Sequence, residues 1–436
     1  MSNTAAPTRT DATGHGPTGA WVVDAARLLL GAGLLTLLLV TLSPFEVSFE
    51  GSRDAGDLVN QVGYSALAVI VLAGHLMFTD RAVAASLLRP AWLVMAAWLV
   101  ISALFAFSPQ NALRTAAFTV LAMIAVTGAL SLPRDGRSFR LCLTVAALAV
   151  LGLSYFGIIA MPGFAIHDGG GTEPQHAGLW RGIYSHKNVA GAVMGALFFC
   201  GLYLLRAGQR WTGLLIAGLS VLFVLKTGSK TATALLPAVA CLVIGLRVFG
   251  GRLLPAFAVG AAVAVMALLT LGTVLSPTLD SLLQAILPST TFTGRTDLWR
   301  FALDLFQGRE WTGFGLNSFW QTGYVYGAER NFELAWDVRT SPNGHNGYLD
   351  VALAMGWPGL CLAVLVLVLL PLRDYVKVGS GLDSQRLADM FLMVLTFLLL
   401  NSFLESFLFD RANPIWMILW MSVVGLRLLA RHRLQR

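Results

Sequence analysis

A histidine and several cations, spread along a strongly apolar chain, are the residues best suited to catalysis. His345 and Asn346 lie in PNGHNGYLDVALAMGWPGL, residues 342–360, directly before a long apolar run. Histidine has a pKa near neutrality and can therefore take a proton from a hydroxyl group. Lys230 in KTGSKTAT and Arg295 in TGRTDLW supply positive charge, which stabilises a phosphate or another anion. These residue types suit chemistry at an anionic centre.

Other polar residues flank or enter the apolar runs. One cluster precedes the sixth run in WRGIYSHKNVAG, residues 180–191, and consists of Arg181, His186, Lys187 and Asn188. Glu405 in NSFLESFLFD falls near the outer end of the eleventh run, where a carboxylate is costly and is by default a functional hypothesis. It could equally be a structural partner of Arg411 or of another cation.

Each candidate also has an ordinary structural interpretation. Arg295 could be a solvated charge, and Lys230 could reach the membrane interface with its long side chain. Lys230 does not belong to a phosphate-binding P-loop, because Ser229 stands where that motif needs glycine. His186 and His345 could be ordinary interfacial histidines.

A metal site is a further alternative. A zinc ion could be bound by His167, Asp168, His176 and His186, but these residues lack the compact spacing of known zinc sites. We therefore expect no bound metal and no cofactor.

The composition is that of a membrane protein. The chain is 56 % hydrophobic and 12 % charged, which is outside the range of soluble domains. A helix needs roughly 20 apolar residues to cross a hydrocarbon core about 30 Å thick. We therefore predict an all-α fold of about twelve spans, at approximately 22–43, 58–78, 91–107, 112–132, 141–161, 189–205, 211–227, 231–248, 253–275, 347–371, 388–408 and 413–430.

Charge sorts the connections into two groups. Basic residues gather in alternate connections, such as the one that contains Arg81 and Arg89, whereas the others are acidic or mixed. The positive-inside rule then places both termini in the cytoplasm. We predict a disordered cytoplasmic tail at 1–20, one transmembrane domain at 21–430 and a basic cytoplasmic tail at 431–436. The net charge of +7 reflects this bias, and we expect no nucleic-acid binding.

The long connection at 276–346, between the ninth and tenth spans, faces the outside under this topology. Its sequence predicts an amphipathic helix that Thr296 or Asp297 caps and Gly308 ends. That helix would lie against the membrane or cover the ends of the spans. Arg295 precedes its start, where free backbone N–H groups and the helix dipole favour a phosphate.

The charged or titratable candidates on this outer side could converge on one site. They are Lys187, Lys230, Arg295, His345 and Glu405. Cations at the outer leaflet suit a diphosphate carried on a lipid, and a neighbouring histidine could deprotonate a sugar hydroxyl. Glycosyl transfer from a lipid diphosphate needs these elements and access from the bilayer. It needs no nucleotide-binding fold, because such a donor is already activated.

The order of the motifs resembles the O-antigen ligase and polymerase superfamily, which consists of integral-membrane glycosyltransferases that use polyprenyl-diphosphate-linked glycans. The matching stretches are YSHKNVAGAVMGAL (184–197), KTGSKTATALL (226–236), TGRTDLW (293–299), GFGLNSF (313–319) and GHNGYLDVALAMGWPGL (344–360). The His-Asn-Gly motif followed by MGWPGL is the most specific of them, whereas GFG is weak.

The resemblance implies a GT-C-like membrane fold and a role for each motif. His345 would act as the base or position the acceptor, and Arg295 and Lys230 would hold the diphosphate. Many ligases carry arginine where Lys230 stands, and a lysine keeps the charge but loses the bidentate fork. Transfer would be metal-independent and would use an undecaprenyl-diphosphate-linked glycan at the periplasmic face of the bacterial inner membrane. We assign substrate binding to Arg181, His186, Lys187, Asn188, Asn346 and Glu405.

Several functions remain open at this point. SHKN and ESF resemble the exopolysaccharide-polymerase branch, in which the acceptor is another lipid-linked repeat unit, whereas a ligase would use a lipid A core. A flippase for the same lipid-linked glycan also needs cations for the diphosphate. A secondary transporter fits less well, because the two halves of the chain are dissimilar and the charged candidates lie at one face.

Overall fold

The computed structural model describes residues 17–45, 58–169, 174–286, 292, 294–331, 334, 336–410 and 413–432. The structure is 77 % helical, and the described part of the chain contains no β-strand. The predicted all-α class is therefore confirmed. Most of the two predicted tails, residues 1–16 and 433–436, lies outside the described residues.

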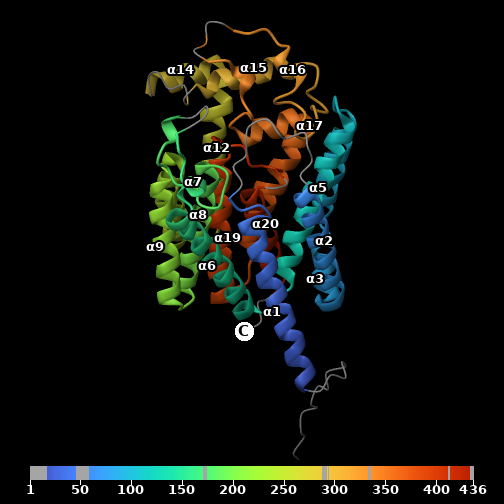
Figure 1. The fold of residues 1–436 in the computed structure, drawn as a ribbon, viewed down its shortest axis with the longest axis vertical. Coiled ribbons are helices and arrows are strands. Elements are labelled where there is room, and N and C mark those ends of the chain that lie inside the picture. The colour runs from blue at the N-terminus through green and yellow to red at the C-terminus, as the bar shows by residue number, and fades with distance from the viewer. Residues whose placement is uncertain are drawn as a thin grey trace, which may run out of the picture.

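Long helices form the body of the molecule (Figure 1). The first half contains α1 (Pro17–Val40), α2 (Leu58–Phe78), α3 (Arg81–Leu87), α4 (Pro90–Leu104), α5 (Pro109–Ser131), α6 (Gly136–Ala160), α7 (Pro162–Ala165), η1 (Pro174–His176), α8 (Lys187–Arg206) and α9 (Arg210–Lys226). The second half contains α10 (Lys230–Ala240), α11 (Leu246–Gly250), α12 (Leu253–Ala267), α13 (Thr273–Leu275), α14 (Pro277–Ile286), α15 (Arg295–Phe306), α16 (Gly323–Tyr326), η4 (Val338–Thr340), α17 (Gly347–Val364), α18 (Leu370–Lys377), α19 (Leu382–Asn401) and α20 (Pro414–Arg431). The π-helical turns η2 (Cys241–Gly245), η3 (Leu268–Gly272) and η5 (Leu365–Leu369) join α10 to α11, α12 to α13 and α17 to α18.

The candidate membrane spans among the described residues are fewer than the predicted spans. Among the described residues, nine helices are long and apolar enough to cross a membrane, and a tenth results if α3 and α4, bent by 51°, form one span. The molecule is thus a polytopic membrane protein, but the predicted count of about twelve is not confirmed. Helix α9 has only 17 residues, and α19 begins with the charged residues Asp383, Arg386 and Asp389. The eleventh predicted span also extends too far, to 408, because α19 ends at Asn401.

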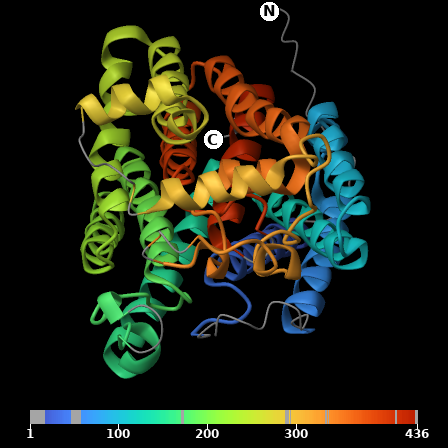
Figure 2. The same ribbon diagram turned by 90° about the horizontal axis from the view of Figure 1, so that it is seen from above.

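The short helices of the long connection cover one end of the bundle. Helices α14, α15 and α16 run across this end, whereas α1 begins and α20 ends at the opposite end (Figure 1). Seen from above, α15 crosses the middle of the bundle (Figure 2). We call α14, α15, α16 and their connecting segments the cap; they belong to the connection predicted at 276–346.

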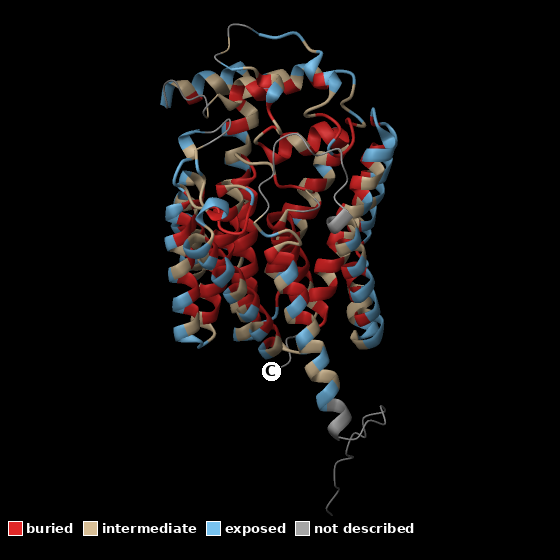
Figure 3. Cartoon of the chain, viewed as in Figure 1, coloured by how far each residue is buried: buried red, intermediate tan, exposed pale blue. Residues whose placement is uncertain are grey.

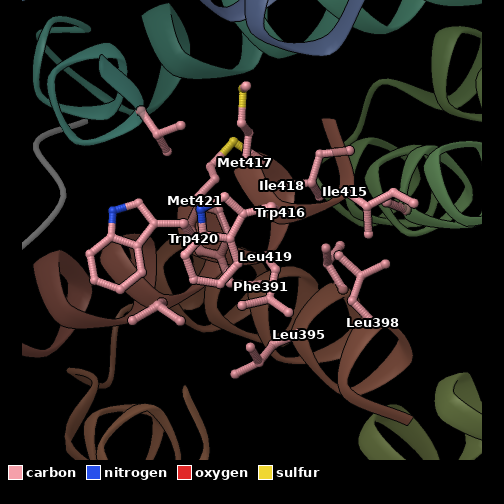
Figure 4. Packing of buried hydrophobic residues seen from close by; sticks show 14 of the residues in the cluster. Phe391, Leu395, Leu398, Ile415, Trp416, Met417, Ile418, Leu419, Trp420 and Met421 are labelled. Atoms are coloured by element: carbon pink, nitrogen blue, oxygen red, sulfur yellow. The ribbon is translucent and has the colours of Figure 1, made fainter. Parts of the chain in front are cut away.

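The core is built around α19 and α20. These two helices pack against each other, and α8 packs against both. Phe391 and Leu398 of α19 belong with Trp416 and Trp420 of α20 to one cluster of buried hydrophobic residues (Figure 4). Buried residues lie in the interior of the bundle, and exposed residues mark the outer helices (Figure 3).

Large apolar side chains also cover the outside of the bundle. Leu76, Ile159, Trp211, Val248 and Phe249 are each more than 80 % exposed. A soluble protein seldom exposes so much apolar surface, whereas the hydrocarbon core of a membrane is a favourable surrounding for it. The outer surface of the bundle therefore agrees with the predicted membrane location.

Helix α17, which begins at the His-Asn-Gly motif, is interrupted where the cap contacts it. Gly356 has a φ of +70° inside this helix. A Cβ atom there would lie 2.4 Å from the carbonyl oxygen of Trp311, so only glycine permits the approach. The adjacent backbone N–H of Phe314, in the GFG motif, donates to the carbonyl oxygen of Leu353 at 2.7 Å. The GFG motif thus attaches the cap to the helix that carries the predicted site.

Candidate active site

The predicted base, His345, stands immediately before α17. Asn346 caps this helix, because its side-chain oxygen accepts from the backbone N–H groups of Tyr348 and Leu349, each at 3.1 Å. His345 has a φ of +45°, in the left-handed region that residues other than glycine seldom adopt. Contacts around the loop must therefore hold this backbone conformation.

Glu405 lies outside any helix, contrary to the prediction that it sits within a span. Helix α19 ends at Asn401, so Glu405 belongs to the connection to α20, and its side chain is 15 % exposed. This connection is bonded to the start of α17, because the Gly347 N–H donates to the carbonyl oxygens of Ser402 at 2.7 Å and Glu405 at 3.1 Å. Arg411, its suggested partner, lies outside the described residues.

The Glu405 carboxylate meets three other predicted site residues. Its Oε1 accepts from Nη2 of Arg295 at 3.1 Å and from Nδ2 of Asn188 at 2.7 Å. Nδ1 of His345 lies 3.6 Å from Oε2, slightly beyond an ordinary hydrogen bond. We call these four residues the Glu405 cluster, and they come from the starts of α8, α15 and α17 and from the connection after α19.

Positive charge surrounds this carboxylate. Burial acts to raise the pKa of Glu405, but its interaction with His345 and the charges of Arg295 and His186 outweigh burial and lower the pKa from its ordinary value of 4.5. Glu405 is therefore ionised at neutral pH. The N-terminal ends of α8, α15 and α17, which are the positive ends of their dipoles, lie beside the same carboxylate, and they add to the positive potential around it.

The N-cap residue directly before Arg295 is a glycine. Arg295 is the first residue of α15, and Gly294 before it has a φ of +80° and makes no side-chain cap. The predicted caps, Thr296 and Asp297, lie instead within the first turn. Gly308, with a φ of +83°, follows the helix end as predicted. The left-handed glycine turns the chain so that Arg295 reaches Glu405 from the cap.

The start of α8 orients Asn188. Nδ1 of His186 accepts from the backbone N–H of Asn188 at 3.1 Å and so caps the helix. Nζ of the buried Lys187 donates to Oδ1 of Asn188 at 3.4 Å. The side-chain oxygen of Asn188 is thereby engaged, and its NH₂ group is left to donate to Glu405.

Three histidines that are distant in the sequence also meet beside α8. The ring centroids of His167, His176 and His186 are 5.3 to 5.6 Å apart. The fold thus joins residues whose wide spacing argued against a common site. Within the described ranges, however, no group of three or more His, Cys, Asp or Glu side chains is arranged to hold a metal ion.

Two predicted residues lie apart from the Glu405 cluster. Lys230 begins α10, is exposed, and makes no hydrogen bond or ion pair with the residues that the structure describes. The turn before it does contact α8, because a Cβ atom on Gly191 would lie 3.2 Å from Cβ of Ser229. Arg181 is buried, and its Nε donates to the carbonyl oxygen of Phe164 at 2.8 Å. The catalytic role of Lys230 as a holder of the diphosphate and the substrate-binding role of Arg181 stay predictions.

The sequence patterns did not single out the residues that hold the loop directly before His345. Nε1 of Trp299 donates to the carbonyl oxygen of Gly344 at 2.8 Å, and Asp350 accepts from the Gly344 N–H. An acidic residue in the first turn of a helix is common, because it interacts favourably with the helix dipole. Asp350 therefore gave no distinctive signal in the sequence.

Comparison with known proteins finds similarity over a stretch that contains several of the motifs. Residues 215–364 match the family model described as O-Antigen ligase; this stretch includes Lys230, Arg295 and His345. Exopolysaccharide production protein ExoQ of Rhizobium meliloti (strain 1021) is 30 % identical over 201 residues. The match covers 43 % of this chain and 45 % of that protein, so it spans less than half of either. The two matches confirm that the chain resembles the O-antigen ligase and polymerase superfamily.

Proposed function

We propose that this protein is a glycosyltransferase that moves a glycan from a polyprenyl-diphosphate-linked donor, such as an undecaprenyl diphosphate, to a saccharide acceptor. The observation that carries the proposal is the Glu405 cluster, in which a cation, an amide and a histidine converge on one carboxylate. An arginine and an imidazole beside the two oxygens of one carboxylate suit a reaction that releases a diphosphate while a hydroxyl loses its proton.

The reaction assigns a task to each group. The acceptor hydroxyl oxygen attacks the anomeric carbon of the donor glycan, and the bond from that carbon to the diphosphate oxygen breaks. The diphosphate leaves with the bonding electrons, and Arg295 stabilises its developing charge. The hydroxyl proton passes to His345, while Glu405 holds the imidazole and stabilises it once it is protonated. Cations neutralise the leaving group, so the transfer we propose needs no metal.

Two further groups would bind the substrates. Lys230 is an exposed cation whose preceding turn contacts α8 near Asn188, and we propose that it takes part of the diphosphate charge. Nδ2 of Asn346 is buried and has no hydrogen-bond partner within the described part of the chain. An unpaired buried donor is costly, and an oxygen of the bound substrate is the partner we propose for it.

The acceptor we favour is a second lipid-linked repeat unit, so that the protein polymerises an exopolysaccharide or an O-antigen. The name of the ExoQ relative supports this choice. The matching family model, described as O-Antigen ligase, supports the alternative in which the glycan is joined to a lipid A core.

We place the reaction at the periplasmic face of the bacterial inner membrane. The starts of α15 and α17 bring the cluster to the cap, whereas α1 begins and α20 ends at the opposite end of the bundle (Figure 1). The basic connections and the positive-inside rule favour cytoplasmic termini, and the cap then faces the periplasm.

The test uses purified protein with a polyprenyl-diphosphate-linked repeat unit as its only substrate, in the presence of a chelator and without nucleotide. Wild type is compared with His345→Ala and with His75→Ala, a control on α2 whose ring contacts Ser131. We expect a ladder of longer lipid-linked glycans from wild type and the control, and its loss in His345→Ala.

The other outcomes separate the alternatives. Transfer that occurs only when a lipid A core is supplied identifies a ligase. Donor binding without transfer to either acceptor contradicts the proposal and favours a flippase for the lipid-linked glycan.

A further inference from the structure

The loop before His345 is held at both backbone groups of one residue, Gly344. The Gly344 carbonyl oxygen accepts from Nε1 of the fully buried Trp299 at 2.8 Å. The Gly344 N–H lies 3.1 and 3.2 Å from the two carboxylate oxygens of Asp350. The next residue, His345, donates its own N–H to Oδ1 of Asn343 at 2.9 Å. These bonds account for the left-handed backbone of His345, which is otherwise unfavourable.

Asp350 also reaches the connection that carries Glu405. The side chain of Ser406, the residue after Glu405, interacts favourably with the Asp350 carboxylate. The Ser406 hydroxyl oxygen accepts from the backbone N–H of Asn346 at 3.1 Å. One carboxylate on α17 is therefore bonded to the segment that carries His345 and interacts with the segment that carries Glu405.

The position of Asp350 is tightly defined. Nε1 of Trp320 donates to its Oδ1 at 2.7 Å, so Asp350 is itself anchored to the cap. A Cβ atom on Gly344 would lie only 2.6 Å from this oxygen, which leaves no room for a larger residue at that position. None of its described bonds is to the atoms of Arg295, His345 or Glu405 that would act on substrate.

We infer that Asp350 is a positioning residue that sets the separation between the imidazole of His345 and the carboxylate of Glu405. The inference rests on the proposed function of these two residues. Catalytic groups must be held within fractions of an ångström, and a misplacement of about 1 Å can cost about 100-fold in rate. Asp350 would therefore affect the turnover number and leave donor binding intact.

The test compares Asp350→Asn with Asp383→Asn, which changes an aspartate in the first turn of another helix, α19. We expect Asp350→Asn to lower kcat by about 100-fold and to change the donor KM by less than about 2-fold. Trp320→Phe removes a bond to Asp350 but keeps its carboxylate, and we expect a smaller loss of kcat with the same unchanged KM. This second variant decides the question if Asp350→Asn does not fold.

A second readout does not depend on activity. The modification of individual histidines by diethyl pyrocarbonate, followed by peptide mass spectrometry, reports how accessible each ring is. We expect His345, whose side chain is 33 % exposed, to react at least about 3-fold faster in Asp350→Asn, because the loop opens locally. His75 on α2 is the internal control and should not change.

The two readouts separate the two claims. If wild type makes no glycan product, the proposed function fails, and the His345 modification rate still tests the positioning role. If wild type is active but Asp350→Asn changes neither kcat nor the reactivity of His345, the positioning role is overturned. A raised KM with unchanged kcat would also contradict it, because Asp350 would then act on binding.

Discussion

A carboxylate within α19 and another in the connection that follows it have opposite surroundings. Asp389, in the first half of the helix, has a fully buried side chain whose Oδ1 is bonded to Arg247 and to the Tyr375 hydroxyl, and whose Oδ2 is bonded to Arg206 at 2.8 Å. Glu405, beyond the end of the same helix, is partly exposed and lies 3.6 Å from His345. The partners of Asp389 come from helices, whereas those of Glu405 stand at helix starts and in a connection.

The difference suggests how similar residue types would serve stability in one place and, under the proposed function, chemistry in another. A buried carboxylate with every oxygen paired holds α8, α11, α18 and α19 together and has no capacity for a ligand. Glu405 keeps an accessible edge and a histidine that is not tightly bonded, and Arg295 beside it is 22 % exposed. Incomplete pairing at an exposed edge therefore distinguishes the carboxylate at which we propose the reaction from the one that stabilises the fold.

The largest effect we expect is a loss of stability at the buried end. Asp389→Ala leaves Arg206 and Arg247 without their carboxylate and should lower the free energy of unfolding by about 3–5 kcal/mol. The measurement is denaturant unfolding in detergent. Asp383→Ala, which removes an exposed partner 3.9 Å from Arg386, should cost about 0.5 kcal/mol or less.

The activity of Asp389→Ala tests whether the two ends of α19 act independently. The fraction of Asp389→Ala that remains folded should keep the wild-type kcat, because Asp389 does not belong to the Glu405 cluster. A large loss of kcat in folded protein would mean that the two ends of α19 are not separate in function.

The next effect concerns the leaving group. Arg295→Ala should lower kcat by about 100- to 1000-fold, because charge stabilisation at a transition state is worth that much. Arg295→Lys should recover part of the loss, since it restores the charge without the planar fork. Arg300→Ala, an exposed residue on the same helix paired with Asp280 and Asp297, is the matched control. Equal losses in Arg295→Ala and Arg300→Ala would point to a general effect on the cap.

A somewhat smaller loss is expected for the carboxylate. Glu405→Gln keeps the size of the side chain but removes the charge beside Arg295 and His345, and should lower kcat by about 100-fold or less. Asp410→Asn, in the same connection, should have no comparable effect. A full-rate Glu405→Gln enzyme would show that Glu405 is only structural.

The smallest effect is on the pH dependence of stability. The pKa of Glu405 is lowered in the folded protein, so its ionised form stabilises the fold above the ordinary value of 4.5, and this contribution is lost as the pH falls through the lower folded pKa. Thermal unfolding of wild type and Glu405→Gln should therefore differ most above pH 4.5 and converge at lower pH. A difference that grows on acidification would contradict the lowered pKa.

Much of the fold follows from the chain's apolar pattern, and the exceptions have physical causes. Long apolar runs predicted most helices within a few residues. The end of α19 was missed because Phe403 and Phe407 continue the apolar run although the backbone has already left the helix, as the two buried rings pack into the core. The N-cap residue of α15 was predicted wrongly. Gly294 forms the turn before the helix through its left-handed backbone and has no side chain that could bond to the first turn.

The site was predicted in its residues but not in its contacts. Asn188, Arg295, His345 and Glu405 were all singled out, because a charge or an amide at the edge of an apolar run is unusual. Their meeting depends on tertiary packing of four segments, which no local pattern encodes. For the same reason the exposed position of Lys230 and the contacts of Asp350 emerge only from the structure.

The most direct test of the proposed active site asks where the diphosphate of the donor binds. A non-hydrolysable donor analogue with a photoreactive group next to its diphosphate would be crosslinked to the purified protein, and the labelled peptides would be sequenced. We predict label on the peptides that contain Asn188, Arg295 or Glu405, with competition by unlabelled donor. Label confined to the opposite end of the bundle, around Arg206 and Arg247, would contradict the proposal that the diphosphate binds at the Glu405 cluster.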